Sequence, residues 1–230
     1  MTLSLMDLNS GAYDYRPLSR LEPPMRGWDA YALQSAFRGF GFPLALDGVL
    51  GDKTAEAIWH YQESRNLVVD GIAGIATQRD LALTLASRFR AEYRLPTGLP
   101  RGHIEKESGF QLGNYTAPYT GGSAVGSRDL GVVQRNTRFH KIEDAFDVMD
   151  SLKVLCERIV AYHRKYVDHG EVNSRRAWEL ACGSWNAPAY CDYLAGLPGG
   201  LKPGPTAHDA LNAYIKATTA YTKWAQKETP

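Results

Sequence analysis

One glutamate stands out as a candidate for acid–base chemistry. Glu107 lies near the expected C-terminal end of a helix whose first turn contains Pro100, after a stretch in which prolines and a glycine interrupt the preceding helical pattern. A carboxylate at this end of a helix faces the negative end of the helix dipole, and burial there raises its pKa. A carboxyl group with a raised pKa donates a proton near neutral pH. Glu107 is therefore a candidate general acid, although most single glutamates are solvated surface residues.

A repeated loop organises the first third of the chain. The segment Asp47–Thr54 (DGVLGDKT) returns 23 residues later as Asp70–Thr77 (DGIAGIAT). In each copy an Asp-Gly pair and a second glycine suit a tight turn, and the threonine is placed to cap the helix that follows. Apolar residues recur at helical spacing before, between and after the two loops. This part of the chain is therefore predicted to alternate three short helices with two turns.

The repeat resembles the three-helix peptidoglycan-binding module of cell-wall proteins. The matching positions lie within about residues 25–83 and include Leu33-Gln34, both loops, and Tyr61-Gln62 between the loops. The resemblance implies bacterial peptidoglycan as the partner and assigns cell-wall binding to the loop residues Asp47, Gly48, Gly51, Thr54, Asp70, Gly71, Gly74 and Thr77. The alternative is that the repeats only build a small helical fold.

Three motifs in the rest of the chain resemble the lysozyme-like superfamily, which includes lysozymes and lytic transglycosylases. The first is Glu107-Ser108-Gly109-Phe110, and the second is the run from Ser127 to Asn136 (SRDLGVVQRN). The third, from Ala181 to Pro188 (ACGSWNAP), resembles an Ala-Tyr-Asn-Ala-Gly segment with Trp for Tyr and Pro for Gly. Their order along the chain implies a helical lysozyme-like domain.

The same resemblance implies roles for individual residues. Glu107 corresponds to the general acid that protonates the glycosidic oxygen between N-acetylmuramic acid and N-acetylglucosamine, and Asp129 corresponds to the second carboxylate of animal-type lysozymes. Asp129 has an alternative interpretation as a turn residue that bonds to its own backbone. The substrate-binding candidates, of which the aromatic ones are equally well explained as buried core, are Ser108, Gly131, Gln134, Asn136, Trp185, Asn186 and Tyr190.

Two reactions and one non-catalytic function remain open. With an active Asp129 the domain would hydrolyse the glycan as a muramidase. Without one, the acetamido and 6-hydroxyl groups of the sugar would give a 1,6-anhydro end, as in lytic transglycosylases. The non-catalytic alternative is a cell-wall-binding virion protein. The two-module layout resembles that of phage endolysins, which implies residence in the host cytoplasm until a holin opens the membrane, and then action on the cell wall.

Composition and charge are those of a folded globular protein. The 26 basic and 25 acidic residues give a net charge of +1, so no overall field points to a nucleic-acid partner. Residues 1–83 carry a net charge of −3 and residues 84–230 a net charge of +4, which is consistent with two parts. No apolar stretch is long enough for a membrane span, and the N-terminus lacks the regions of a secretory signal peptide.

These observations predict a mainly α-helical monomer without stable membrane insertion. The expected organisation is an N-terminal segment (1–24), a small three-helix peptidoglycan-binding domain (25–83) and an α-helical lysozyme-like domain (84–230). The apolar spacing from Ile142 to His163 predicts one continuous core helix. Four basic residues in and after the second motif are expected to form a solvated face, with attraction of anionic groups of a cell envelope as the alternative; they are Arg128, Arg135, Arg138 and Lys141.

Metal and cofactor chemistry are not predicted. The six histidines lack the paired spacing of zinc ligands, and the three cysteines lack the spacing of a zinc site. No metal and no cofactor are therefore expected. Cys156, Cys182 and Cys191 are expected to be reduced, with a disulfide between Cys182 and Cys191 as the alternative.

Overall fold

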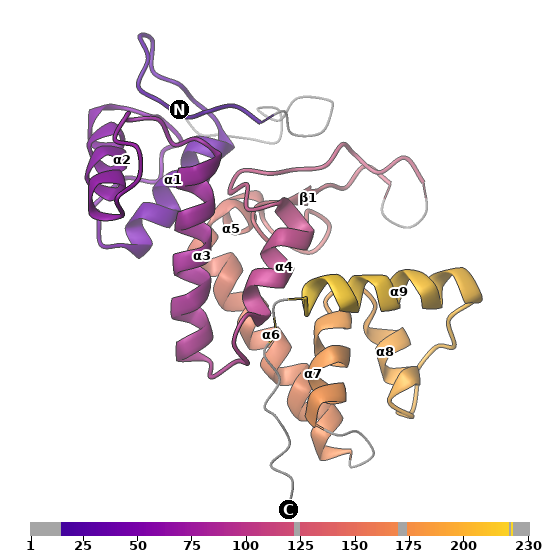
Figure 1. The fold of residues 1–230 in the computed structure, drawn as a ribbon. Coiled ribbons are helices and arrows are strands. Elements are labelled where there is room, and N and C mark those ends of the chain that lie inside the picture. The colour runs from indigo at the N-terminus through magenta and orange to yellow at the C-terminus, as the bar shows by residue number, and fades with distance from the viewer. Residues whose placement is uncertain (1–14, 122–124, 170–173, 221, 223–230) are drawn as a thin grey trace, which may run out of the picture. The chain divides into compact units, whose positions relative to one another are not determined.

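Helices dominate the protein (Figure 1). The structure is a computed structural model that describes residues 15–121, 125–169, 174–220 and 222. Within these residues it contains nine helices and one sheet of two antiparallel strands, so the predicted mainly α-helical fold class is confirmed. Most of the predicted N-terminal segment, namely residues 1–14, lies outside the described residues.

The chain divides into two compact units. The first comprises residues 1–85 and 107–152, and the second comprises residues 86–106 and 153–230. The predicted boundary between residues 83 and 84 falls inside one helix, α3 (Ile75–Glu92). The two domains expected from the sequence remain a prediction, and the two units are described separately below.

Three helices and two loops open the first unit, in the predicted order. Helix α1 (Trp28–Gly39), helix α2 (Asp52–Ser64) and the first part of α3 pack their apolar faces together. Phe37 and Tyr61 are buried in this core with their ring centroids 5.7 Å apart, and Leu85 is also buried. Trp59, which shares the helical spacing of α2, is instead 56% exposed.

The two loop threonines do not cap these helices, which corrects the prediction. The N-cap of α2 is Gly51, and Thr54 lies inside the first turn of the helix. Thr77 likewise lies inside the first turn of α3. The physical reason is that both hydroxyl groups accept a hydrogen bond from a glutamine amide of the preceding helix, over 3.4 Å for Thr54 and 3.2 Å for Thr77.

A short hairpin holds the second motif. Helix α4 (Leu99–Ser108) ends at the first motif, as predicted, and strands β1 (Asp129–Leu130) and β2 (Arg135–Asn136) pair with Asp129 opposite Asn136. Gly131 begins the turn between the strands at φ +75°, and a Cβ atom there would lie 2.0 Å from the carbonyl oxygen of Ala145. Only glycine therefore fits at this position.

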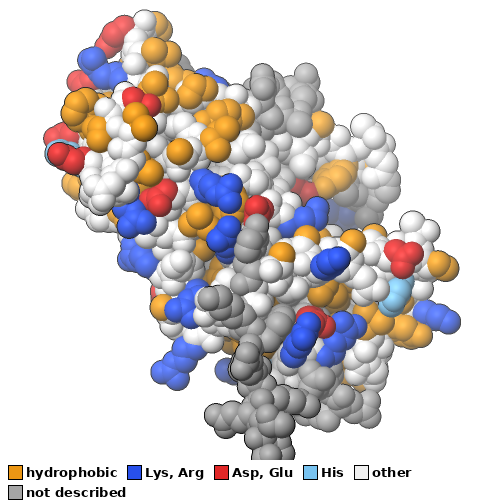
Figure 2. All heavy atoms as spheres, viewed as in Figure 1, with side chains coloured by type: hydrophobic (Ala, Val, Ile, Leu, Met, Phe, Trp, Pro, Cys, Tyr) orange, Lys and Arg blue, Asp and Glu red, His pale blue; other side chains and the backbone are white. Residues whose placement is uncertain are grey.

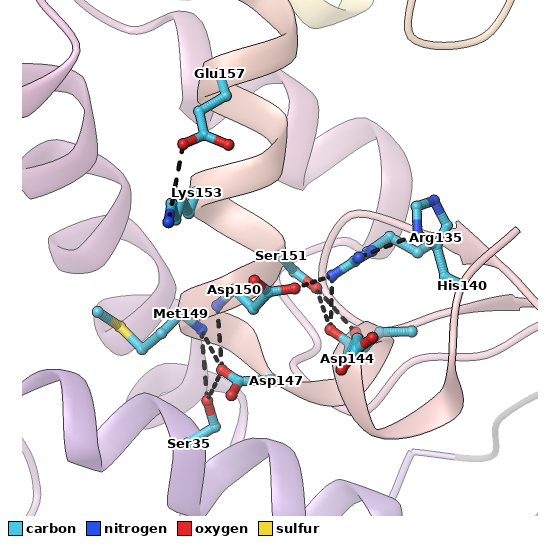
Figure 3. A network of polar contacts seen from close by, with 11 residues as sticks. Ser35, Arg135, His140, Asp144, Asp147, Met149, Asp150, Ser151, Lys153 and Glu157 are labelled. Atoms are coloured by element: carbon cyan, nitrogen blue, oxygen red, sulfur yellow. Dashed lines mark hydrogen bonds and ion pairs between the residues drawn. The ribbon is translucent and has the colours of Figure 1, made fainter.

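The segment from Ile142 to His163 is two helices, and the prediction of one continuous helix is wrong. Helix α5 (Ile142–Phe146) and helix α6 (Val148–Asp168) are separated by Asp147, whose backbone is extended. The Asp147 carboxylate accepts hydrogen bonds from the backbone N–H groups of Met149 (3.0 Å) and Asp150 (3.1 Å), and from the hydroxyl of Ser35 (2.6 Å; Figure 3). These bonds make Asp147 the cap of α6, which offsets the loss of helical continuity.

The second unit contains the remaining helices. Helices α7 (Ser174–Gly183) and α9 (Pro205–Thr218) contact each other, and α8 (Pro188–Leu194) packs against α7. Gly102 of α4 approaches the carbonyl of Thr218 so closely that a Cβ atom would lie 2.0 Å from its oxygen. None of the helices in the described ranges is long and apolar enough to cross a membrane.

Candidate functional site

The buried side chain of Gln34 forms hydrogen bonds with both ends of the turn in the first repeated loop. Its side chain is 2% exposed, and its amide nitrogen donates to Asp47 Oδ1 (2.7 Å) and to the carbonyl of Val49 (2.9 Å). Its amide oxygen accepts the backbone N–H groups of Asp47 (3.1 Å) and Gly48 (2.9 Å). A single buried glutamine therefore satisfies several polar groups that the turn leaves unpaired.

Gln62 repeats this arrangement in the second loop. Its amide nitrogen donates to Asp70 Oδ1 (2.9 Å) and to the carbonyl of Ile72 (2.9 Å), and its oxygen accepts the N–H of Gly71 (3.0 Å). The Asp70 carboxylate also accepts the N–H of Ile72 at 2.9 Å. These hydrogen bonds, with that of Ile72 as the largest contribution, lower the pKa of Asp70 below its usual range.

The eight loop residues predicted to bind cell wall thus have defined places. Gly48 and Gly71 adopt positive φ angles of 65° and 71°, which turn the chain. The aspartate and threonine of each loop accept hydrogen bonds from the glutamine of the preceding helix. Gly51 and Gly74 precede α2 and α3. These contacts explain why the loop residues are needed for the fold, and their contact with peptidoglycan remains a prediction.

Glu107 occupies the last turn of α4, as the sequence predicts. It is partly exposed, and Ser108 beside it is buried. The positive φ angles of Gly109 (59°) and Phe110 (70°) end the helix directly after this pair. The Phe110 ring is held under the guanidinium group of Arg79, 4.6 Å from the ring centroid. The helix end that carries Glu107 is therefore anchored within the first unit.

Asp129 is held by two side chains from other parts of the first unit. The hydroxyl of Tyr119 donates to Asp129 Oδ2, and the amide of Asn136 donates to Asp129 Oδ1 at 2.8 Å. The backbone N–H of Asp129 donates to the Thr116 hydroxyl at 3.0 Å. Asp129 therefore does not act as a turn residue bonded to its own backbone, because strand pairing and these partners fix its carboxylate.

Tyr119 is a protonated hydrogen-bond donor to Asp129. The pKa of Tyr119 is raised to about 12, first by its hydrogen bond to Asp129, then by burial and the charge of Asp129, and last by the charge of Glu107. Its phenol therefore stays protonated and donates to Asp129 at all physiological pH values. Sequence reasoning missed Tyr119 and Thr116, because the segment between the first two motifs has no periodic pattern.

The remaining residues of the second motif shape the hairpin. Gln134, at φ 55°, donates from its amide to the carbonyls of Gly131 (2.8 Å) and Asn114 (3.4 Å). Asn136 also donates to the Ser127 hydroxyl at 3.2 Å. Gly131 allows the chain to pass close to the backbone of Ala145 within the protein. The contact of Gly131 with a sugar remains a prediction.

Comparison with known protein families assigns the first of these regions. Residues 26–81 match the model of a family described as "Putative peptidoglycan binding domain". The match supports a peptidoglycan-binding module in this region. No curated protein and no solved structure matches the chain significantly. The match covers both loops of the module and supports peptidoglycan as the partner of the protein, and it ends before Glu107.

The third motif lies in the second unit and is described there by itself. Trp185 and Asn186 lie between α7 and α8, where Trp185 is partly exposed and Asn186 is exposed. The guanidinium group of Arg158 lies over the Trp185 ring at 5.4 Å from the centroid. Tyr190 is a partly exposed residue of α8. These side chains are accessible, as sugar-binding residues must be, and their role remains a prediction.

Only two of the four basic residues expected to form a solvated face are exposed, which corrects that expectation. Arg138 and Lys141 are exposed, but Arg128 and Arg135 are only 8% and 5% exposed. Arg135 donates to Asp150 Oδ2 (2.6 Å) and to the carbonyl of Asp144 (2.7 Å), and its other terminal nitrogen lies 3.0 Å from His140 Nδ1 (Figure 3). The buried guanidinium group therefore ties the hairpin to α5 and α6.

Other titratable groups of the second unit are structural. His103 is fully buried, with Nε2 3.4 Å from the carbonyl oxygen of Cys182, and burial lowers its pKa to about 4, so it is neutral at pH 7. Cys156, Cys182 and Cys191 are free thiols in the structure, and burial raises the pKa of each. Among the described residues no group of His, Cys, Asp and Glu side chains is arranged to hold a metal ion.

Proposed function

We propose that the protein cleaves peptidoglycan, as a muramidase acting on the β-1,4 bond between N-acetylmuramic acid and N-acetylglucosamine. The observation that carries the proposal is the environment of Asp129, whose carboxylate is held by the hydroxyl of Tyr119 and the amide of Asn136 in the same unit as Glu107. Most glycosidases use two carboxyl groups in different surroundings, and Glu107 at a helix end and Asp129 in the hairpin are candidates for such a pair. The peptidoglycan-binding module would bind the polymer on which such a pair would act.

In this proposal the two carboxylates have different roles. Glu107 donates its proton to the glycosidic oxygen, and the bond from that oxygen to the anomeric carbon breaks. Asp129, held by Tyr119 and Asn136, stabilises the positive charge that develops on the sugar. Water then adds to the anomeric carbon, and its proton returns to Glu107. Because both Asp129 oxygens already accept hydrogen bonds, electrostatic stabilisation is favoured over direct attack by this carboxylate.

Mass spectrometry of purified sacculi digested by the full-length protein tests this proposal. We expect soluble fragments with reducing ends, and a decrease in their release of about 10²–10⁴-fold for Glu107→Gln, the effect typical of removing a general acid. Glu105→Gln is the matched control, because it removes a carboxylate from the same helix two residues away. Equal loss in both variants, or unchanged release by Glu107→Gln, overturns the assignment of Glu107.

The fragments also decide between the remaining functions. Fragments with 1,6-anhydro ends would show a lytic transglycosylase, in which the 6-hydroxyl of the sugar replaces water. Intact glycan after long incubation would show a non-catalytic cell-wall-binding protein, such as a virion component. In that case Glu107→Gln would bind sacculi as the unchanged protein does.

We also propose that the protein acts as a phage endolysin. The proposal is supported by the presence of a peptidoglycan-binding module next to the carboxylate pair. It places the protein in the host cytoplasm until a holin opens the membrane. Expression in a bacterial host with and without a co-expressed holin tests it: lysis only with the holin is expected, and lysis without it contradicts the proposal.

A further inference from the structure

The peptidoglycan-binding module contains a pocket beside its first repeated loop, and Lys53 near the end of that loop is one of the lining residues. The pocket has a volume of about 310 Å³, within the range of sites for small ligands. One wall is the segment after α1, and the other is one face of α2. The lining residues are Phe42, Pro43, Leu44, Lys53, Glu56, Ala57 and His60. None of the eight loop residues predicted to bind cell wall lies among them.

The apolar part of the pocket is packed against the core of the module. Leu44 and Ala57 are almost fully buried, at 9% and 2% exposure. The Phe42 ring packs edge to face against Phe37 of the core, with 5.6 Å between ring centroids. Side chains anchored in this way keep an apolar surface in place without a ligand, which lowers the entropic cost of binding.

The rim of the pocket is charged. Lys53 is exposed and makes no hydrogen bond or ion pair with any described residue, whereas Glu56 lies 3.7 Å from His60. Figure 2 shows hydrophobic, basic, acidic and histidine side chains side by side over α2, at the upper left of the view. The pocket therefore combines small apolar contacts with a cation that has no partner among the described residues and with a nearby carboxylate.

We propose that this pocket binds the stem peptide of peptidoglycan and not its glycan. Stem peptides carry methyl side chains, free carboxylates and, at the crosslinking residue, an amino group. The methyl groups fit the apolar wall, a carboxylate pairs with Lys53, and the amino group pairs with Glu56. This inference extends the peptidoglycan-binding assignment of the module and does not depend on cleavage of the glycan.

The glycan is a poorer match to the same pocket. Sugar rings are bound by flat, exposed aromatic faces and by many neutral hydrogen-bonding groups. The aromatic rings of the lining are the phenyl ring of Phe42, which packs against the core, and the imidazole of His60, and the lining has no side-chain amide or hydroxyl. The exposed aromatic residue of the module, Trp59, is not among the lining residues, and its ring lies against Gly71. A glycan-binding module would be expected to bind through a surface of that kind.

The test measures binding of the full-length protein to purified sacculi near physiological salt, where nonspecific charge attraction is screened. All proteins carry Glu107→Gln, so that the proposed cleavage does not remove the substrate. Lys53→Gln removes the cation of the pocket, and Arg38→Gln removes an exposed cation of α1 that does not line it. We expect a roughly fivefold weaker affinity for Lys53→Gln, typical of one exposed ion pair, and no change for Arg38→Gln.

Two further measurements identify the ligand. Soluble stem peptide should compete with sacculi for the protein, and sacculi stripped of their peptides by an amidase should bind at least tenfold more weakly. Equal binding to stripped glycan, or equal weakening by Lys53→Gln and Arg38→Gln, overturns the proposal. If the protein binds no sacculi at all, the peptidoglycan-binding assignment is overturned as well. If only the cleavage proposal is wrong, the fragment analysis shows it and these affinities do not change.

Discussion

The repeated loops of the module and the hairpin that carries Asp129 use the same residue types for different purposes. In the module, the Asp70 carboxylate bonds to Gln62 and to the backbone of its own turn. In the hairpin, the Asp129 carboxylate bonds to the side chain of Asn136 on the paired strand and to that of Tyr119 on the preceding segment. An aspartate bonded to the backbone of its own turn stabilises the turn. An aspartate whose carboxylate is held by other side chains is positioned, as a reacting group must be.

Glycine substitutions give the largest expected contrast between the two regions. Gly131 and Gly71 have similar φ angles, 75° and 71°. A Cβ atom added at Gly131 would lie 2.0 Å from a backbone oxygen, which cannot move away easily. A Cβ atom added at Gly71 would lie 2.8 Å from the edge of the Trp59 ring, which is a movable side chain. We expect Gly131→Ala to lower the free energy of unfolding by about 4 kcal/mol, and Gly71→Ala by about 1–2 kcal/mol. Urea denaturation measures both, and equal losses would contradict the proposed backbone clash.

Glutamine substitutions give a smaller contrast. Gln62 is 1% exposed and completes its loop, whereas Gln134 is partly exposed and donates only to nearby carbonyls. Gln62→Ala leaves buried polar groups without partners and should cost about 2–3 kcal/mol of unfolding free energy. Gln134→Ala should cost about 1 kcal/mol or less, because water replaces its bonds. A larger loss for Gln134→Ala would show that the hairpin, and not the module, depends on its glutamine.

The helical repeat was predictable because its signals are local. Each loop lies next to the helix that it begins, and residues such as Leu81 and Leu85 keep the helical spacing. The break at Asp147 was not predictable from that spacing, because apolar residues continue at the same period on both sides of it. Its cap is the single carboxylate of Asp147, which also accepts a hydrogen bond from Ser35, more than 100 residues away.

The candidate site was predictable only in part, because some of its contacts are local in sequence and others are not. The position of Glu107 at a helix end follows from Pro100 and Gly109, which are close in sequence. The burial of Arg135 and the contact between Tyr119 and Asp129 depend on how separate segments pack. A basic residue beside a polar motif is most often solvated, so no local signal distinguished Arg135 from Arg138.

The smallest predicted effect concerns the residue that distinguishes the hairpin from the module. Tyr119→Phe removes the hydroxyl that donates to Asp129 and leaves the ring in place. If Tyr119 positions a carboxylate of the proposed reaction, kcat should fall about tenfold, the value of one hydrogen bond to a charged group, while KM stays within about twofold. Tyr93→Phe is the matched control, because its hydroxyl also bonds a carboxylate, that of Glu157, at 3.2 Å in the second unit. An unchanged kcat for Tyr119→Phe, or an equal decrease in both variants, would reduce the Tyr119–Asp129 contact to a structural bond of the kind found in the repeated loops.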